Sequence, residues 1–254
     1  MRLIFIRHAE PDYDSDSLTE HGIREAECLN RFLKNIDLGK VYSSPLGRAL
    51  QTAQIATEGK NVDIQQVFWL EEIGKIVRRQ EDPELRISYS KPDEGPDGNY
   101  IPWDLKPFHL AKHPEYFDPY NWRTSPAARF SNLPELYDER TKRLDDLLAE
   151  KGYIREGLCY KSEQGCHDTL TFFTHLGISN LLISHLINTS PFTVWHGFSI
   201  PTSSVTIIHT EEREKGTVLF RIRQMGDISH LNLQNIEPSF NARFCEVYED
   251  DTRH

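Results

Sequence analysis

The sequence has no long hydrophobic run and few cysteines, and each absence excludes a class of protein. No stretch of its 254 residues approaches the roughly 18 consecutive apolar residues of a membrane span, so we expect no transmembrane helix and no membrane partner. Only four apolar residues precede Arg7, too few for a signal peptide, and we therefore expect a cytoplasmic protein. The scattered cysteines indicate neither a disulfide scaffold nor, lacking a CxxC pair, a structural zinc site. They are Cys28, Cys159, Cys166 and Cys245.

The sequence also lacks the basic excess of a nucleic-acid-binding protein. Asp and Glu number 39 against 29 Lys and Arg, giving a formal net charge of −10. Proteins that hold nucleic acid through its backbone do so with clustered Lys and Arg, so we expect no nucleic-acid partner. A small anionic substrate is still compatible with this charge. Surface fields are screened beyond roughly 8 Å at physiological salt, so a local pocket can be positive.

The first 72 residues alternate short apolar runs with helical patterns, which predicts a parallel sheet covered by helices. Thr19 is placed to cap the first helix, and Ser44 followed by Pro45 is placed to start the second. The predicted elements are a strand over 2–6, a helix over 19–34, a strand over 40–42, a helix over 45–58 and a strand over 62–70.

Residues 73–131 differ in composition, because they hold eight of the 14 prolines and many aromatic residues. We interpret them as an ordered, mostly irregular insertion that packs over the core of a single domain spanning 1–254 and caps the active site. The NLPE string then predicts the start of a helix over 132–151. Beyond it we expect a strand over 169–174, a helix over 176–187, and strands over 203–209 and 218–222. The last of these is predicted as an edge strand, joined to its neighbour by the charged turn EEREKG.

Candidate functional residues follow the ends of the predicted strands. Arg7 and His8 follow the first strand, Arg48 lies early in the second helix, and His175 ends the TLTFFT strand. Glu71 and Glu72 close the third strand. In open parallel sheets ligands bind at the carboxyl ends of strands, so these side chains could converge on one crevice.

This set of side chains suits phosphoryl transfer. The transition state spreads negative charge over three equatorial oxygens, which fixed cationic donors stabilise, and the arginine fork matches phosphate oxygens. A neutral imidazole is a competent nucleophile, and a carboxyl group can protonate the leaving alkoxide and then activate water. The scheme requires no metal ion or other cofactor. By spacing alone, however, structural and catalytic roles for these residues are about equally supported.

The strings LIFIRHAE, LTEHGIREAE, VYSSPLGRALQTA, LEEI and TLTFFTHLG resemble the histidine phosphatase superfamily, also called the phosphoglycerate mutase-like family. The resemblance implies a three-layer α/β/α sandwich around a mostly parallel sheet. It also implies a phosphorylated nucleophile at His8, phosphate ligands at Arg7 and Arg48, and a general acid/base at Glu72 rather than Glu71. His175 matches the second histidine, which is expected to act protonated as a donor to the transition state.

Three positions depart from the family pattern. Ala9 replaces the usual glycine after the first histidine, a change of one small residue for another. Leu176 replaces the glycine that commonly follows the second histidine, and we expect its side chain to narrow or reshape the pocket. Asp14 stands where many members carry Asn and would repel phosphate unless it turns away or binds a cationic part of the substrate.

The remaining histidines suggest structural roles. His109 and His113 have helical i, i+4 spacing, but Pro114 follows and no third metal ligand is obvious, so we expect no metal site. For the WHGF segment at 195–198 and for His230 we favour packing over contact with substrate.

The sequence therefore predicts a metal-independent phosphatase that hydrolyses a small phosphomonoester through phospho-His8. A mutase that returns the phosphoryl group to its substrate is the first alternative. It would need a phosphoenzyme shielded from water and cationic groups for a substrate carboxylate, and Asp14 together with the acidic insertion argues mildly against it. An inactive phospho-ligand-binding module is the second alternative, disfavoured because all five catalytic positions are present.

Overall fold

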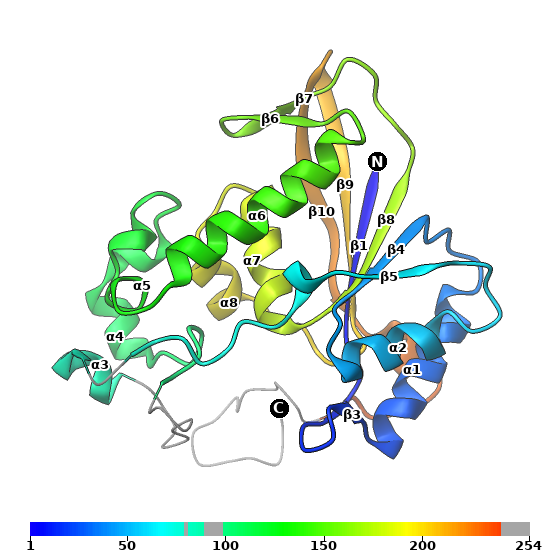
Figure 1. The fold of residues 1–254 in the computed structure, drawn as a ribbon, viewed down its shortest axis with the longest axis horizontal. Helices are drawn as coiled ribbons and strands as arrows, with labels where there is room; N and C mark the ends of the chain where they lie inside the picture. Colours follow the sequence, from blue (N-terminus) through cyan, green and yellow to red (C-terminus); the bar gives the residue numbers. More distant parts are fainter. Residues whose placement is uncertain (79–80, 89–98, 240–254) are drawn as a thin grey trace.

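A mixed eight-stranded sheet organises the computed structural model, which describes residues 1–78, 81–88 and 99–239 (Figure 1). Cys245 and parts of the insertion therefore lie outside the described residues. The strand order is β5-β4-β8-β1-β9-β10-β7-β6. The strands are β1 (Arg2–Arg7), β4 (Lys40–Ser43), β5 (Ile64–Gln66), β6 (Ile154–Glu156), β7 (Cys159–Lys161), β8 (Thr169–Thr174), β9 (Val205–Glu214) and β10 (Thr217–Asp227). A separate small hairpin joins β2 (Pro11–Asp12) to β3 (Ser17–Leu18).

Strand direction confirms the predicted α/β class. Strands β5, β4, β8 and β1 pair in parallel, and each pairing from β1 through β9, β10 and β7 to β6 is antiparallel. Six of these eight strands consequently run in one direction, with β9 and β7 reversed. At the centre, Ile6 of β1 lies opposite Phe173 on one side and Val205 on the other. The mostly parallel half holds the strand ends that carry the candidate residues.

Helices cover both faces of the sheet and complete the three layers. One face, through Ile4 and Ile6, packs against α1 (Glu20–Leu33) and α2 (Gly47–Ala56). The opposite face, through Leu3 and Phe5, belongs to the larger core that includes α6 (Leu133–Ala149), α7 (Leu176–Leu186) and α8 (Pro191–Gly197). Because residues alternate across a strand, an uninterrupted apolar run such as LIFI supplies both cores. The two helical layers are separated by the sheet in Figure 1. The short helix α9 (Ser229–Asn232) lies against α1.

Helix starts were predicted correctly for α1 but not for α2. Thr19 caps α1, its hydroxyl accepting the Gly22 N–H at 3.0 Å. Helix α2 begins at Gly47 with Leu46 at its N-cap, so neither the Ser44 cap nor a helical Pro45 is correct. The Ser44 hydroxyl instead lies 2.8 Å from Nε2 of His175. For α6 the start was correct, although the Asn132 side chain makes no capping bond.

The strand predictions failed mainly at sheet edges. Only Ile64–Gln66 of the expected strand over 62–70 pairs with β4, and the chain then forms the 3₁₀ helix η1 (Phe68–Leu70). The charged stretch EEREKG is mostly strand, with the turn at Gly216, because Glu211 pairs with Arg213 and Arg221 on the exposed hairpin. Strand β10 is not an edge, since β7 and β6 extend the sheet beyond it.

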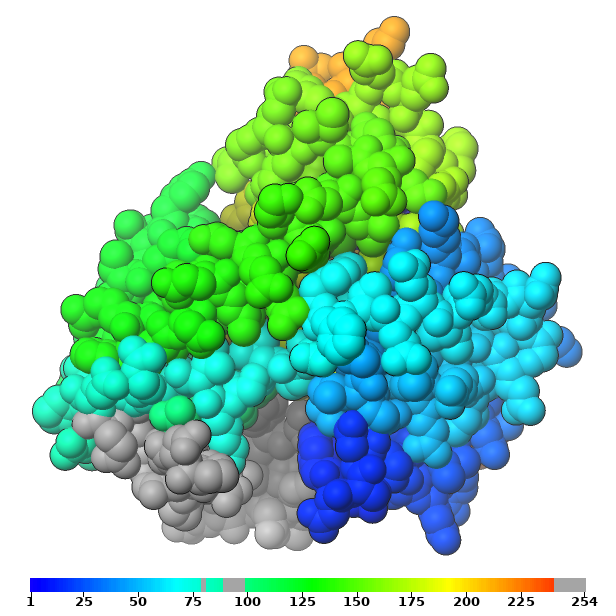
Figure 2. Space-filling model, in the orientation of Figure 1, coloured from blue at the N-terminus to red at the C-terminus, as the bar shows by residue number. Residues whose placement is uncertain are grey.

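The insertion is more helical than its composition predicted. Its described part contains α3 (Pro83–Ile87), α4 (Pro107–Lys112), η3 (Pro114–Phe117), η4 (Asn121–Thr124) and α5 (Pro126–Arg129). Four of these five elements begin with proline, which fits the first helical turn because its missing N–H is not needed there. Tyr116 and Trp122 are buried against Phe192 of α8, with ring centroids 4.6 and 6.2 Å away. In Figure 2 the insertion and α6 form one side of this face and residues up to about 75 form the other.

None of the helices in the described ranges is long and apolar enough to cross a membrane.

Candidate active site

His8 lies immediately after β1, and both its backbone N–H and its backbone carbonyl form hydrogen bonds. Its N–H donates to Thr174 O at 2.9 Å, and its carbonyl accepts the Ser203 N–H at 3.0 Å. Nδ1 lies 2.7 Å from Ala9 O. Because a carbonyl oxygen only accepts, Nδ1 carries the proton and Nε2 keeps its lone pair. Burial and the Arg7 and Arg48 charges hold the pKa of His8 well below its usual range, so the imidazole is neutral and its Nε2 is nucleophilic.

His175 lies beside His8, with ring centroids 5.1 Å apart and the planes inclined by 57°. It occupies the N-cap position of α7, and its side chain is fully buried. Nε2 faces the Ser44 hydroxyl at 2.8 Å, while Nδ1 has no hydrogen-bond partner among the described residues. Burial, followed by the charges of neighbouring groups, lowers the pKa of His175 well below its usual range. The protonated form expected from the sequence therefore requires an anion beside the ring.

Two arginines add positive charge to the same site. Arg7 is 4% exposed and donates from Nη1 to Ile200 O at 2.7 Å. Arg48, in the first turn of α2, has its guanidinium carbon 5.5 Å from the Tyr13 ring centroid. The Nε atoms of both arginines are buried and have no hydrogen-bond partner in the described part of the chain. Each arginine thus keeps a donor for an anion that enters beside His8.

Asp16 is a site residue that the sequence analysis missed. Its carboxylate accepts the Gly47 N–H at 2.6 Å and pairs with Nη1 of Arg48. Asp16 thereby bonds the start of α2, as Ser44 was expected to do, and orients Arg48 as well. Its backbone has φ of +47°, a left-handed conformation in which Asp is enriched. Nothing in the spacing of a polar loop indicates which carboxylate folds back onto the helix.

Glu72, rather than Glu71, is bonded to the start of α7. Its Oε2 accepts the Gly177 N–H at 3.0 Å, and its Oε1 accepts the Ile178 N–H at 2.9 Å. Oε1 also accepts the N–H of Ile73 at 2.9 Å. Burial raises the pKa of Glu72 against the opposing effect of these bonds and of the Arg7 charge. A buried carboxyl group with a raised pKa has the property required of a proton donor.

The three positions that depart from the family pattern differ in exposure and in contacts. Asp14 is exposed, and its N–H donates to Asp12 Oδ1 at 3.0 Å within the β2–β3 turn. Leu176 is 6% exposed and belongs to the main apolar core, so the expectation that it reshapes the pocket is replaced by a packing role. Ala9 is fully buried, with its N–H donated to the Thr52 hydroxyl at 3.0 Å.

Ser203 and His230 support His8 from the C-terminal part of the chain. Ser203 has φ of +56° and aims its N–H at the His8 carbonyl, while its hydroxyl lies 2.9 Å from Nε2 of His230. Burial lowers the pKa of His230 to about 4, and its ring lies 5.7 Å from that of Phe32. His230 therefore acts on the site through Ser203.

The insertion reaches the site through Trp103. A Cβ added to Gly177 would lie 2.3 Å from Trp103 and 2.6 Å from Oε1 of Glu72, so the indole and the carboxylate pack on the same α-carbon. Trp195 of the WHGF segment donates from Nε1 to the Gly177 carbonyl at 2.9 Å, and its ring lies 5.5 Å from that of Trp103. These contacts show packing by Trp195 beside the start of α7.

Comparison with known proteins finds a family model and relatives that are similar to parts of this chain. The family model of the Histidine phosphatase superfamily (branch 1) matches residues 3–87. A 2,3-bisphosphoglycerate-dependent phosphoglycerate mutase from Thermoplasma acidophilum is 42% identical over 81 residues, 28% of this chain and 40% of the mutase. The chain thus matches less than half the length of that mutase. An adenosylcobalamin/alpha-ribazole phosphatase from Salmonella typhi is 22% identical over 205 residues, 77% of this chain and 84% of that protein.

Solved structures extend the likeness over most of the fold. A phosphoserine phosphatase from Entamoeba histolytica aligns with a TM-score of 0.57 and 19% identity, covering 91% of this chain and 98% of that one. The alpha-ribazole phosphatase from Shigella flexneri aligns with a TM-score of 0.54 and 19% identity, covering 89% and 96%. The family model confirms the resemblance recognised from the motifs over residues 3–87, and the solved structures show that the chain shares the fold of these phosphatases.

Proposed function

We propose that the protein is a metal-independent phosphatase that hydrolyses a small phosphomonoester through a phosphohistidine on His8. The observation that carries the proposal is the state of His8. Its Nδ1–H is held by Ala9 O, and Nε2 is left unprotonated in a buried site with two guanidinium groups. A neutral nucleophile beside fixed cations suits attack on a phosphate dianion.

The reaction proceeds in two displacements. In the first, Nε2 of His8 forms a bond to phosphorus while the ester P–O bond breaks, and Glu72 gives its proton to the leaving alkoxide. In the second, water attacks phosphorus, Glu72 takes a proton from that water, and the N–P bond breaks to release inorganic phosphate. The raised pKa of Glu72 supports its starting role as the acid.

Arg7, Arg48 and His175 stabilise the charge that develops on the transferred group. Both arginines have a buried Nε donor without a partner in the described chain, and His175 has an unpartnered Nδ1. Such donors cost little reorganisation when charge develops, because the fold already holds them in place. An arriving phosphate raises the pKa of His175 and so favours its protonated, donating form.

The insertion at 73–131 is assigned to substrate selection. Trp103 packs against Gly177 beside Glu72, so this segment reaches the leaving-group side of the proposed reaction. Loops that vary over a fixed scaffold commonly determine specificity. We also propose that the protein is cytoplasmic and that its substrate is a small phosphorylated metabolite. Phosphatases for phosphoserine and for alpha-ribazole phosphate are among the proteins of similar structure.

A mutase activity is the second candidate, and one observation favours it. The Thermoplasma acidophilum mutase is 42% identical to this chain over 81 residues, a higher identity than the ribazole phosphatase reaches over its longer alignment. A mutase would keep its phosphoenzyme for minutes and would be stimulated by a bisphosphorylated sugar acid. A phosphatase transfers the group to water at the rate of turnover.

The deciding experiment compares the wild-type protein with His8→Ala in hydrolysis of p-nitrophenyl phosphate, with EDTA in both reactions. Loss of a covalent nucleophile typically costs on the order of 10⁴-fold or more in kcat, which is the expected result. Acid-quench and base-quench trapping then tests for an acid-labile, base-stable phosphoryl group on the wild type. Equal turnover by the two proteins would contradict the mechanism. Retention of the phosphoryl group for minutes would favour the mutase.

A further inference from the structure

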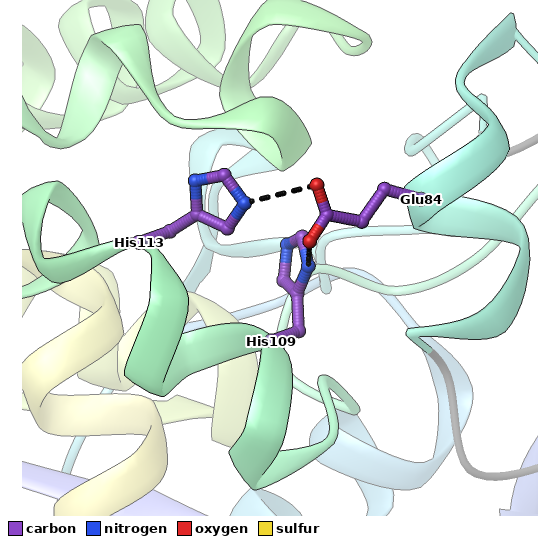
Figure 3. Close-up of side chains that lie close together, drawn as sticks. All are labelled: Glu84, His109 and His113. Atoms are coloured by element: carbon purple, nitrogen blue, oxygen red, sulfur yellow. Dashed lines mark ion pairs between the residues drawn. The ribbon is translucent and has the colours of Figure 1, made fainter.

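Three potential metal ligands converge in the insertion, away from the arginine-rich site. Glu84 lies on α3, His109 on α4, and His113 directly follows α4. The three side chains point toward one another in Figure 3. Nδ1 of His109 lies 3.6 Å from Oε1 of Glu84, and Nε2 of His113 lies 3.3 Å from Oε2. All three ligand atoms lie within 4.8 Å of one another. The structure therefore supplies the third ligand that the sequence analysis did not find.

Both imidazoles direct their inward nitrogens at the Glu84 carboxylate. Nδ1 of His109 and Nε2 of His113 are buried without hydrogen-bond partners in the described chain, and His109 is completely buried. The outward nitrogens are occupied: Nε2 of His109 lies 2.9 Å from the Tyr116 hydroxyl, and Nδ1 of His113 lies 3.0 Å from Oε1 of Glu115.

The outward bonds are compatible with the tautomers that a metal ion requires. Glu115 can accept a proton on Nδ1 of His113, and in that tautomer Nε2 keeps a lone pair. The Tyr116 hydroxyl already accepts the Ala127 N–H at 2.9 Å and has a second lone pair for a proton on His109 Nε2. With both imidazoles neutral in this way, two nitrogen lone pairs and a carboxylate face one another without an intervening positive charge.

We propose that Glu84, His109 and His113 bind a divalent transition-metal ion of the zinc type. Zinc prefers imidazole nitrogen and carboxylate oxygen at about 2.0–2.2 Å, which places tetrahedral ligand atoms roughly 3.4 Å apart. The separations of 3.6 and 3.3 Å, which run to the two oxygens of Glu84, are close to this spacing, and the three ligand atoms all lie within 4.8 Å of one another. The outward partners, Glu115 and Tyr116, orient the imidazoles as the outer shell of a metal site usually does. Water completes the fourth position.

The surrounding charges are compatible with a cation. Glu115 and Asp82 are near His113 and His109 respectively. Lys112 opposes them, with Nζ 3.7 Å from Oε1 of Glu84, but its side chain is 62% exposed and can turn into solvent. The ion would join α3 to α4 and η3, which have five, six and four residues. Helices this short are not stable alone, so we assign the ion a structural role in the insertion.

A metal-free cluster is the competing description. In it, a protonated His113 would lie between Glu84 and Glu115 as an ion pair, and the cluster would have no particular affinity for zinc. The two descriptions differ in a quantity that is measured directly, the stoichiometry and affinity of metal binding.

The test uses the full chain without added histidines, stripped of metal by a chelator that is then removed. Zn²⁺ is titrated calorimetrically, and Co²⁺ is added to record the visible absorption of a tetrahedral site. We expect one equivalent of Zn²⁺ per chain and a higher Tm on loading. Glu84→Gln and His113→Gln should lower the affinity at least 100-fold and abolish the Tm shift. Both side chains are partly exposed, so these variants are expected to fold.

Two controls locate the ion. The double variant His167→Ala/His209→Ala removes two histidines that line another surface pocket and should bind zinc like the wild type. His8→Ala should also bind normally, which separates the proposed site from the catalytic imidazoles. Loss of binding in His8→Ala with retention in Glu84→Gln would overturn the proposal. Wild-type affinity no higher than that of His113→Gln would overturn it as well.

Discussion

Two pairs of histidines lie in this chain with similar ring separations and opposite charge surroundings. His8 and His175 have centroids 5.1 Å apart, and His109 and His113 have centroids 4.6 Å apart. The first pair lies among guanidinium groups, and the charge of Arg48 lowers the pKa of both His8 and His175. The second pair faces the carboxylate of Glu84.

The difference shows that the neighbours of an imidazole, rather than the imidazole itself, determine its chemistry. A neutral ring beside fixed cations attacks or donates to an anion, and a neutral ring beside carboxylates binds a cation. One histidine of each pair also faces an oxygen with its Nδ1: Ala9 O for His8 and Glu115 for His113. Experiments that change one neighbour at a time therefore test both assignments.

Among changes to the neighbours of the two pairs, removal of a cation from the first pair has the largest expected effect. Arg48→Ala should lower kcat/KM for a phosphomonoester about 100- to 1,000-fold, because one preorganised donor contributes about 2.7–4 kcal/mol to the transition state. Steady-state kinetics measures the change, with Arg213→Ala as a control arginine that is largely exposed. Turnover within threefold of the wild type would contradict the proposed role of Arg48 as a phosphate ligand.

The corresponding change at the second pair is Glu115→Gln. An amide can still face Nδ1 of His113, but it loses the negative charge that makes the ring a better ligand. Loss of an outer-shell partner typically lowers metal affinity 10- to 100-fold, and we expect that loss for Zn²⁺ by calorimetry. Phosphatase turnover should be unchanged, and an equal fall in kcat would show that the two pairs are coupled.

Asp16→Asn should have a smaller effect on the first pair. Arg48 would keep its charge but lose its charge-assisted bond, which we expect to lower kcat/KM about tenfold, or about 1.4 kcal/mol. To separate a positioning role from an effect on folding, kcat/KM is measured for Arg48→Ala and for the double variant Arg48→Ala/Asp16→Asn. If Asp16 acts through Arg48, the second substitution adds little to the first. Fully additive losses would assign Asp16 a role of its own.

The smallest expected change is with pH. The folded-state pKa of His8 lies below 6.5, so its nucleophilic form persists as the pH falls through 6.5 and is lost only at lower pH. A histidine with the ordinary pKa would cost roughly tenfold at pH 5.5, whereas we expect less than about twofold change in kcat/KM between pH 7 and 5.5. In Arg48→Ala the acid limb should move to higher pH, because a charge that lowers this pKa is gone. If the acid side of the pH profile of kcat/KM does not move in this variant, the group that titrates there is not His8.

Helices with a regular hydrophobic period and strands with an uninterrupted apolar run were predictable from the sequence. The TLTFFT strand and helix α1 were correct because an unbroken apolar run and a helical apolar stripe each specify one structure. Strands β6 and β7 were missed because each is only three residues long and the two strands together have one buried residue, Tyr160, so burial leaves no repeating pattern in them. The β9–β10 hairpin was shortened for a related reason, since its outer part is stabilised by cross-strand charges.

The candidate site was predictable where residues adjoin strand ends and unpredictable where loops fold back. The carboxyl ends of neighbouring parallel strands bring His8 and His175 together, whatever lies between them in the chain. Asp16, Ser203 and Glu84 reach their partners through loop conformations or through packing of distant segments. No local spacing encodes such contacts, so the sequence showed the i, i+4 spacing of His109 and His113 but gave no sign of Glu84, and the expectation of no metal site followed from that.

Gly177 links the reacting centre to the insertion in a way that limits redesign of the protein. Its α-carbon is covered on one side by the Trp103 indole and on another by the Glu72 carboxylate, and even a methyl group would collide with both. An insertion transplanted from a relative would therefore need a flat ring at this point and a host with no side chain at residue 177. Under the proposed role of the insertion, exchange of substrate preference would thus depend on Gly177, a buried position with no side chain of its own.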